Sequence, residues 1–225
     1  MDQYRARILA RVDREPPPLD VLLAPRAAEI SNGRLRGDHD MNPEDWEETP
    51  AVALRAAAVL VPIVEHPAGP SILLTRRSDN LGNHAGQVAF PGGKMEPGET
   101  PAVAALREAD EEVGLKSSFV EVAGYLDSYE TGSGFRILPV VGFVRPGFTL
   151  EIHDGEVAEV FEVPLSFLMN PKNHERHSAT WRGKRREYYA MPYNGHYIWG
   201  ATAGMLKNMY DRIFAGDGIE GVDVR

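Results

Sequence analysis

Short runs of apolar and β-branched residues alternate with turn residues along the chain, which predicts a fold rich in strands. The runs of strand length are residues 56–64, 71–76, 87–90, 119–126, 136–144 and 157–163. The first two are expected to pair as a hairpin across the turn at 66–70. Apolar residues at helical spacing predict helices at 2–13, 165–169 and 199–215. This mixture indicates a mostly antiparallel or mixed sheet packed between helices.

Two segments lack a clear period. Residues 31–48 are polar and acidic, which predicts an extended or partly mobile lead-in with Trp46 as a lone packing anchor. Residues 171–191 are polar and basic, and we expect the cations at 184–186 to form basic loop surface, with contact to a phosphate as the alternative. The Asn-Gly pair at 194–195, flanked by two apolar runs, predicts a tight hairpin turn.

The length of 225 residues suffices for one generous domain with an extension. We place an N-terminal helix and acidic lead-in at 1–50 and the main domain at 51–225. A hydrophobic content of 43% and a charged content of 25% are typical of a globular protein. The absence of cysteine excludes disulfides, thiolate metal ligands and cysteine nucleophiles.

The formal net charge of −9 argues against general binding to nucleic acid or to anionic membranes, which requires broad basic surfaces. The N-terminal residues lack the apolar core of a signal peptide. The longest apolar run, 56–64, is far shorter than the ~20 residues that a membrane helix needs. We therefore expect a cytoplasmic protein without nucleic-acid or membrane partners.

The best-defined predicted element is an acidic helix. Thr100 followed by Pro101 is typical of a helix start, and Gly114 is typical of a left-handed helix end, so about 13 helical residues are expected between them. At about 100° per residue, one arc of this helix is apolar and the neighbouring arc is acidic. The apolar arc holds Ala102, Ala105, Leu106, Ala109 and Val113, and the acidic arc holds Glu108, Glu111 and Glu112.

The spacing of the three glutamates places like charges side by side. Pairs three or four residues apart on a helix repel by a few tenths of a kcal/mol. A hard divalent cation such as Mg²⁺ or Mn²⁺ would offset this repulsion, because it prefers carboxylate oxygens. Gly92 and Gly93 precede the helix and would allow the backbone to approach a metal or ligand closely. The alternative is a solvated acidic face without a metal.

Residues 93–115, GKMEPGETPAVAALREADEEVGL, fill every fixed position of the pattern G-x5-E-x7-R-E-U-x-E-E-x-G-U, with U apolar. This pattern resembles the signature of the Nudix hydrolases. The resemblance implies an α/β/α sandwich with a mixed central sheet, here with an N-terminal helical extension. It also implies metal binding by Glu108, Glu111 and Glu112, with a carbonyl of Gly92 or Gly93 as a further ligand, and a structural pairing of Glu99 with Arg107.

The same resemblance implies hydrolysis of a pyrophosphate with Mg²⁺ or Mn²⁺ as cofactor. The implied catalytic residues are Glu108, Glu111 and Arg107. The general base stays open: Glu108 or Glu111 could accept the proton of the attacking water, and so could a later carboxylate such as Glu156 or Glu159.

Residues 73–93 resemble the motif LLTxRSx3Rx3Gx3FPGG of the coenzyme A pyrophosphatase branch, except that Gly82 stands where an arginine is usual. The expected products are adenosine 3′,5′-bisphosphate and 4′-phosphopantetheine. Arg76, Arg77 and His84 would form a compact anion-binding cluster for such a substrate. The alternative is that the two arginines end an edge strand in solvent and that the histidine is structural.

Three functions are therefore consistent with the sequence. The main hypothesis is a coenzyme A pyrophosphatase. The second is hydrolysis of another nucleoside diphosphate derivative, such as ADP-ribose or NADH, at the same metal helix. The third is a catalytically silent nucleotide-binding domain. In each case the partner is a small molecule, and a homodimer is one possible assembly.

Overall fold

The computed structural model describes residues 2–24, 35–43, 54–181 and 183–215. Among these residues, nine strands form a mixed sheet in the order β1-β7-β8-β2-β3-β4, with β5 paired to β2, β6 to β8 and β9 to β3. The strands are β1 (Leu35–Gly37), β2 (Arg55–Val64), β3 (Ser71–Arg77), β4 (Val88–Ala89), β5 (Gly92–Lys94), β6 (Val120–Tyr125), β7 (Ser128–Glu130), β8 (Phe135–Val144) and β9 (Val157–Pro164).

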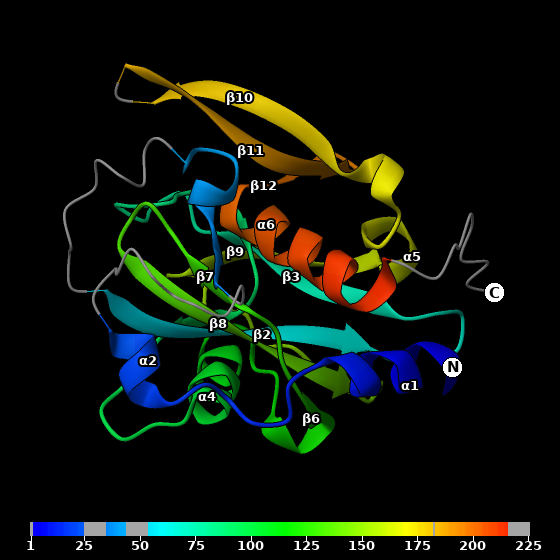
Figure 1. Cartoon of the computed structure of the whole chain (residues 1–225). Coiled ribbons are helices and arrows are strands. Elements are labelled where there is room, and N and C mark those ends of the chain that lie inside the picture. The colour runs from blue at the N-terminus through cyan, green and yellow to red at the C-terminus, as the bar shows by residue number, and fades with distance from the viewer. Residues whose placement is uncertain (1, 25–34, 44–53, 182, 216–225) are drawn as a thin grey trace.

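Helices lie on both sides of this sheet, which confirms the expected α/β architecture (Figure 1). The helices are α1 (Asp2–Arg11), α2 (Leu19–Leu23), α4 (Pro101–Val113), α5 (Leu165–Leu168) and α6 (Gly200–Met209), and a π-helical turn, Tyr210–Phe214, follows α6. Short 3₁₀ turns occupy Asp38–Asp40, Ser117–Phe119 and Pro171–Asn173. No helix in the described ranges combines the length and the apolar character needed to cross a membrane.

Strand β2 is buried along almost its whole length because both of its faces are covered. Ala58 and Leu60 pack with α4 in one core cluster, whereas Val59 and Val61 pack with α6 in another. This alternation follows from the two-residue period of a strand. The long parallel pairing of β2 with β8 fixes the centre of the sheet.

The predicted hairpin of β2 and β3 is confirmed only at its closed end. The two strands pair at Ile63 with Ile72 and at Val64 with Ser71, and they then separate. The glycine strand β5 pairs with β2 beyond this point, with Gly92 opposite Val59. The separation of β2 and β3 therefore makes room for the glycines beside α4.

Helix α4 has the predicted bounds and caps. The side chain of Thr100 accepts a hydrogen bond from the Val103 N–H at 3.3 Å, and Pro101 is the first helical residue. Gly114 ends the helix with φ of 73°. Ala105 and Ala109 are fully buried against the sheet, so the apolar arc faces the core as expected.

A second sheet of three antiparallel strands, β10 (Glu175–Trp181), β11 (Lys184–Tyr193) and β12 (His196–Trp199), covers α6. The expectation of basic loop surface at 184–186 is wrong, because these residues begin a long strand. Nearly every residue of β10 is exposed, so neither face of the strand needs apolar residues. The sequence therefore lacks the alternation of apolar and polar residues that predicts a strand. Asn194 and Gly195 have φ of 46° and 85°, which confirms the predicted hairpin turn between β11 and β12.

The predicted lead-in contributes a strand to the main sheet. Residues 35–37 form β1, which pairs in parallel with β7, so this part is not a loose connection. Trp46 lies outside the described residues. The sequence gives little sign of β1 because a strand of three residues is too short for a detectable period.

The two ends of the described chain meet. Arg7 Nε and Arg11 Nη1 donate hydrogen bonds to the Ile213 carbonyl at 2.8 and 2.9 Å. Ile8 of α1 is fully buried in the same core cluster as Ile213. Helix α1 is therefore part of the core on the α6 side of the main sheet.

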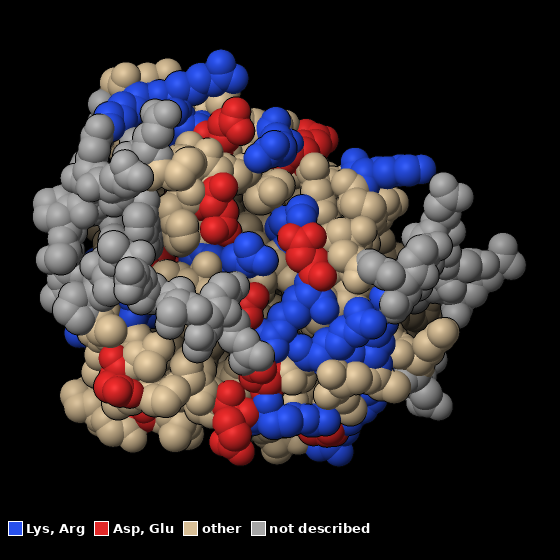
Figure 2. Space-filling view, viewed as in Figure 1, with Lys and Arg blue, Asp and Glu red and all other residues tan. Residues whose placement is uncertain are grey.

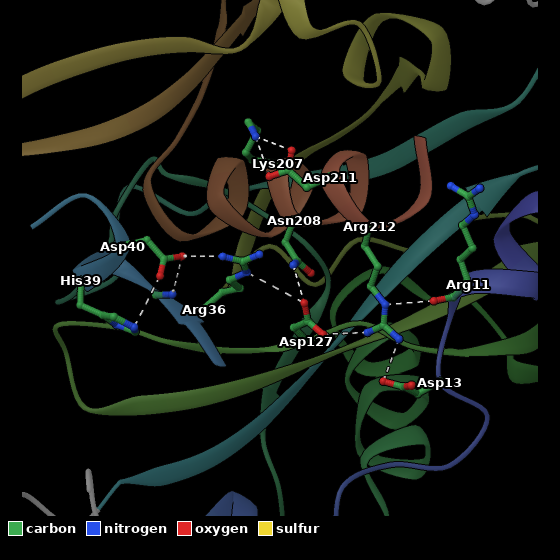
Figure 3. Close-up of polar contacts among 11 residues, drawn as sticks. Arg11, Asp13, Arg36, His39, Asp40, Asp127, Lys207, Asn208, Asp211 and Arg212 are labelled. Carbon is green, nitrogen blue, oxygen red and sulfur yellow. Dashed lines mark hydrogen bonds and ion pairs between the residues drawn. The ribbon is translucent and has the colours of Figure 1, made fainter. Parts of the chain in front are cut away.

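Arg212 connects this corner to the rest of the fold (Figure 3). Its guanidinium reaches Asp127 Oδ1 and Asp13 Oδ2, both at 2.8 Å, and its Nε donates to the Arg11 carbonyl at 2.9 Å. The Arg212 side chain is only 16% exposed. The contacts join α1 and the segment before β7 to the C-terminal helix.

We expect Arg212→Met to lower the free energy of unfolding by about 1–2 kcal/mol, because it removes the nearer of the two cations beside the largely buried Asp127 and leaves only Arg36, at 4.0 Å. Urea denaturation followed by circular dichroism measures the change. Arg145→Met is the matched control, since Arg145 lies on the surface and its side chain donates a hydrogen bond to the Ser118 carbonyl without contacting a carboxylate in the described part of the chain. Equal effects of the two variants would contradict the role given to Arg212.

Candidate active site

The glycine strand approaches the acidic helix closely. The Gly92 N–H donates to Glu112 Oε2 at 3.1 Å. A Cβ on Gly92 would lie 2.5 Å from the Ala58 carbonyl oxygen, and a Cβ on Gly93 would lie 2.5 Å from the Glu108 carboxylate. Gly92 also has φ of 153°, a conformation that residues with a side chain rarely adopt. A side chain at position 92 would clash with the backbone of β2, and one at position 93 would displace the Glu108 carboxylate from the strand.

Arg107 binds the loop before α4 to the acidic face of the helix. Its Nε and Nη2 donate to the two oxygens of Glu99 at 2.7 and 3.0 Å, and its Nη1 donates to Glu108 at 2.9 Å and to Glu111 at 3.0 Å. Nη2 also reaches the Lys94 carbonyl at 3.3 Å. The expected pairing of Glu99 with Arg107 is thus present, and these bonds hold the pKa of Glu99 below its usual value.

Glu112 is the most deeply buried of the helix carboxylates, with a relative exposure of 4%. Burial raises its pKa to about 7, and the nearby charges of Glu108 and Glu156 act in the same direction. The Gly92 N–H and Arg77 oppose this shift. Burial also raises the pKa of Glu108, against the opposing effect of Arg107. The site therefore crowds carboxylates into a poorly solvated space.

The basic residues predicted to bind the substrate each contact a different group. Arg76 contacts Asp79 at 3.2 Å and Glu159 at 3.4 Å. Arg77 points to Glu112 at 3.9 Å. His84 is exposed, and its ring contacts the side chain of Gln87 at 3.0 Å. Neighbouring residues of a strand point to opposite faces, so Arg76 and Arg77 diverge.

Three comparisons with known proteins bear on this arrangement. The family model described as NUDIX domain matches residues 54–182, more than half of the chain. The chain belongs to the Nudix family. A relative described as an uncharacterized Nudix hydrolase, NudL, from Photorhabdus laumondii is 41% identical over 160 residues, 71% of this chain and 85% of that protein. The NudL of Escherichia coli K12 is 40% identical over 156 residues, 69% of this chain and 81% of that protein.

Solved structures also match parts of this chain, at low sequence identity. DR0079 from Deinococcus radiodurans is 16% identical with a TM-score of 0.47, covering 72% of this chain and 88% of that chain. An Ap4A hydrolase from C. elegans is 20% identical with a TM-score of 0.42, covering 50% of this chain and 81% of that chain. As a Nudix hydrolase, the chain is an enzyme that cleaves pyrophosphate bonds, and the family generally uses divalent metal cations.

The carboxylates of this Nudix site suit a divalent cation by their chemistry, although their side chains are not arranged around one point. Among the described residues, no three acidic or histidine side chains stand together as a ready metal-binding set. Arg107 Nη1 instead contacts both Glu108 and Glu111. Burial raises the pKa values of Glu108 and Glu112, because the ionised carboxylates are poorly solvated. A bound divalent cation that prefers oxygen ligands would lower these pKa values again, because its charge favours the ionised carboxylates. Such an ion would compete with Arg107 for carboxylate oxygens.

The later carboxylates separate into two groups. Glu156 acts electrostatically on Glu108 and Glu112, whereas Glu159 pairs with Arg76 and with His196 Nε2 at 3.7 Å. Of the two later candidates for general base, Glu156 is thus the one beside the helix carboxylates.

Sequence reasoning missed the contact of Arg77 with Glu112. Strand parity could have found it, because Leu73 and Arg77 are four residues apart and Leu73 packs on the α4 side.

Proposed function

We propose that this Nudix hydrolase cleaves the pyrophosphate bond of coenzyme A or a derivative of it. The products would be adenosine 3′,5′-bisphosphate and 4′-phosphopantetheine or its acyl form. The segment 73–93 carries the proposal, because it has all but one of the residues typical of the coenzyme A branch. The same segment ends in Gly92 and Gly93 beside the helix carboxylates, so its sequence pattern and the candidate site coincide.

Arg77 supports binding of a phosphate at this place. Its Nη1 lies 3.9 Å from Glu112, while its buried Nε has no hydrogen-bond partner among the described residues. Buried donors are normally paired, so this N–H is available to a ligand oxygen. We propose that Arg77 binds and orients a substrate phosphate beside the helix carboxylates.

We propose Glu108, Glu111 and Glu112 as the residues that hold Mg²⁺ or Mn²⁺, with a Gly92 or Gly93 carbonyl as a further ligand. When bound, the metal neutralises phosphoryl charge and makes water more acidic. In the reaction, a water oxygen bonds to one phosphorus while the bond from that phosphorus to the bridging oxygen breaks. The proton of the water passes to a carboxylate, for which Glu108, Glu111 and Glu156 are the candidates.

Gly82 provides a direct test of the substrate assignment. It is exposed, it does not have a positive φ, and a Cβ built on it has no neighbour within 4 Å. We expect Gly82→Arg to leave stability unchanged and to lower KM for coenzyme A by roughly two- to fivefold, the value of one exposed charge contact. Steady-state kinetics measure this. Asn83→Arg is the control, and a gain equal to that of Gly82→Arg would indicate nonspecific attraction.

Product analysis by mass spectrometry tests the proposed function. The purified protein is incubated with coenzyme A, ADP-ribose, NADH and a dinucleoside polyphosphate, each with Mg²⁺ and separately with Mn²⁺. The proposal predicts preferential release of 4′-phosphopantetheine from coenzyme A. Preferential cleavage of another substrate would retain the metal helix and reject coenzyme A. Binding without any product would favour a silent nucleotide-binding domain.

A further inference from the structure

A cavity of about 210 Å³ lies between α6, β1 and the second sheet. Its walls come from the α6 side of the main sheet, whereas the helix carboxylates lie on the α4 side (Figure 1). Tyr129 and Tyr189 contribute aromatic surface, and the remaining walls are largely polar. The cavity is therefore separate from the candidate active site, and it is smaller than the roughly 300–1,000 Å³ of pockets for larger ligands.

Three cations from three different elements line this cavity. Arg36 comes from β1, Arg176 from β10 and Lys207 from α6. Two carboxylates also line it. Asp211 binds Lys207 with both oxygens at 2.6 Å, and Asp40 lies 4.0 Å from Arg36. Arg176 has no carboxylate partner among the described residues, so the cations exceed the anions at the wall.

Two of the residues that line the cavity each have a buried polar atom without a hydrogen-bond partner within the described part of the chain. One is Arg36 Nε, which lies 4.0 Å from an oxygen of Asp127, too far for a hydrogen bond. The other is Oδ1 of Asn208, a residue that is only 5% exposed. Its Nδ2 donates to Asp127 at 2.7 Å. Figure 3 shows the side chains of Arg36 and Asn208 both beside Asp127.

The unpaired atoms indicate which hydrogen-bonding groups a ligand in the cavity would need. More than about 90% of buried polar groups in folded proteins have a hydrogen-bond partner. Arg36 Nε needs an acceptor, and Asn208 Oδ1 needs a donor. The excess of cations at the wall favours an anion. A carboxylate offers only acceptors, whereas a phosphate that retains one proton offers both an acceptor and a donor.

We propose that this cavity binds a singly charged phosphate group, either inorganic phosphate or a small phosphate monoester. Phosphate oxygens accept hydrogen bonds from Arg36 and Arg176, and the phosphate hydroxyl donates to Asn208 Oδ1. The volume equals that of roughly seven water molecules, which accommodates such a group with a short substituent. Bound phosphate would tie β1 and β10 to α6. The site is independent of the proposed hydrolase activity and lies outside its machinery.

Isothermal titration calorimetry with inorganic phosphate tests the proposal. The titration is made at pH 6 in EDTA, so that no metal draws phosphate to the active site. We expect one saturable site in the unaltered protein and at least about tenfold weaker binding in Arg176→Gln, because a charged hydrogen-bond donor is lost. Arg185→Gln is the matched control, since Arg185 belongs to the same sheet and contacts Ser178 instead of the cavity. Its affinity is expected to stay unchanged.

Two further titrations test the role of the phosphate proton. Sulfate has the same shape but no proton at this pH, so it is expected to bind at least about tenfold more weakly. Asn208→Asp removes the neutral acceptor and adds a negative charge, and it is expected to weaken binding further. Titration with glycerol phosphate then distinguishes a monoester site, which binds it as well as phosphate, from a site for inorganic phosphate alone.

Absence of saturable phosphate binding in the unaltered protein would overturn the proposal and leave a water-filled cavity. Equal affinities for phosphate and sulfate, or an unchanged affinity in Arg176→Gln, would also overturn it. Arg36→Gln serves as a second variant if Arg176→Gln fails to fold by circular dichroism. Since every readout is binding, failure of the hydrolase proposal does not affect this test.

Discussion

Glu112→Gln is expected to reduce metal-dependent hydrolysis by at least about a hundredfold, because loss of a direct ligand should cost no less than loss of a residue that supports one. The fold should survive. Glutamine has nearly the same shape, its amide oxygen can accept the Gly92 N–H, and burial already raises the pKa of Glu112 to about 7. Initial rates at saturating Mg²⁺ and thermal unfolding of the metal-free protein measure the two effects.

Asp110→Asn on the same helix is the control for this prediction. Asp110 contacts Lys116 at 2.6 Å and takes no part in the candidate site. Its removal should change the rate by less than about twofold, as expected for an exposed ion pair. If Glu112→Gln retained the full rate with a folded protein, the assignment of α4 as the metal helix would be wrong.

Removal of the Arg107 side chain should have the second large effect, on stability. We expect Arg107→Ala to lower the free energy of unfolding of the metal-free protein by about 2–3 kcal/mol. The guanidinium contacts three carboxylates, and Glu99 and Glu108 are only 13% and 16% exposed. Without the guanidinium, the carboxylates of Glu99 and Glu108 would lose their cation while water reaches them only in part. Mg²⁺ should stabilise this variant more than the unaltered protein, because the ion no longer competes with a guanidinium.

Arg107→Lys separates charge from geometry. A lysine ammonium cannot make the paired bonds to both Glu99 oxygens, so we expect it to restore less than half of the lost stability. A double-mutant cycle with Glu99→Gln should give a coupling energy of at least about 1 kcal/mol. Additive effects of Arg107→Ala and Glu99→Gln in urea denaturation would show that the loop is held by other contacts.

The parts of the fold that were predictable have strong local signals. Thr100, Pro101 and Gly114 determine the bounds of α4, because caps act through bonds within a few residues. The Asn194-Gly195 turn is predictable for the same reason, since both residues tolerate a positive φ. The acidic face and the glycine pair likewise follow from spacing along one helix and one strand.

The rest depends on contacts between distant segments. Strand β1 exists because it pairs with β7, about 90 residues later in the chain. Strand β10 is held by β11 and presents polar residues on both faces, so its apolar period is absent. The divergence of Arg76 and Arg77 requires knowledge of strand register. The two arginines are adjacent in one motif, and the motif does not indicate that their side chains lie on opposite faces of the sheet.

The pairing of α1 with the segment after α6 has a consequence for biosynthesis. The arginines of α1 bind the carbonyl of Ile213, which is synthesised about 200 residues later. At about 5–20 residues per second, α1 waits roughly 10–40 s for these partners. A ten-residue helix is marginal in isolation, so it is expected to remain unfolded or bound by chaperones during this interval. The corner near Arg212 is thus completed only after Arg212 and Ile213 have been synthesised.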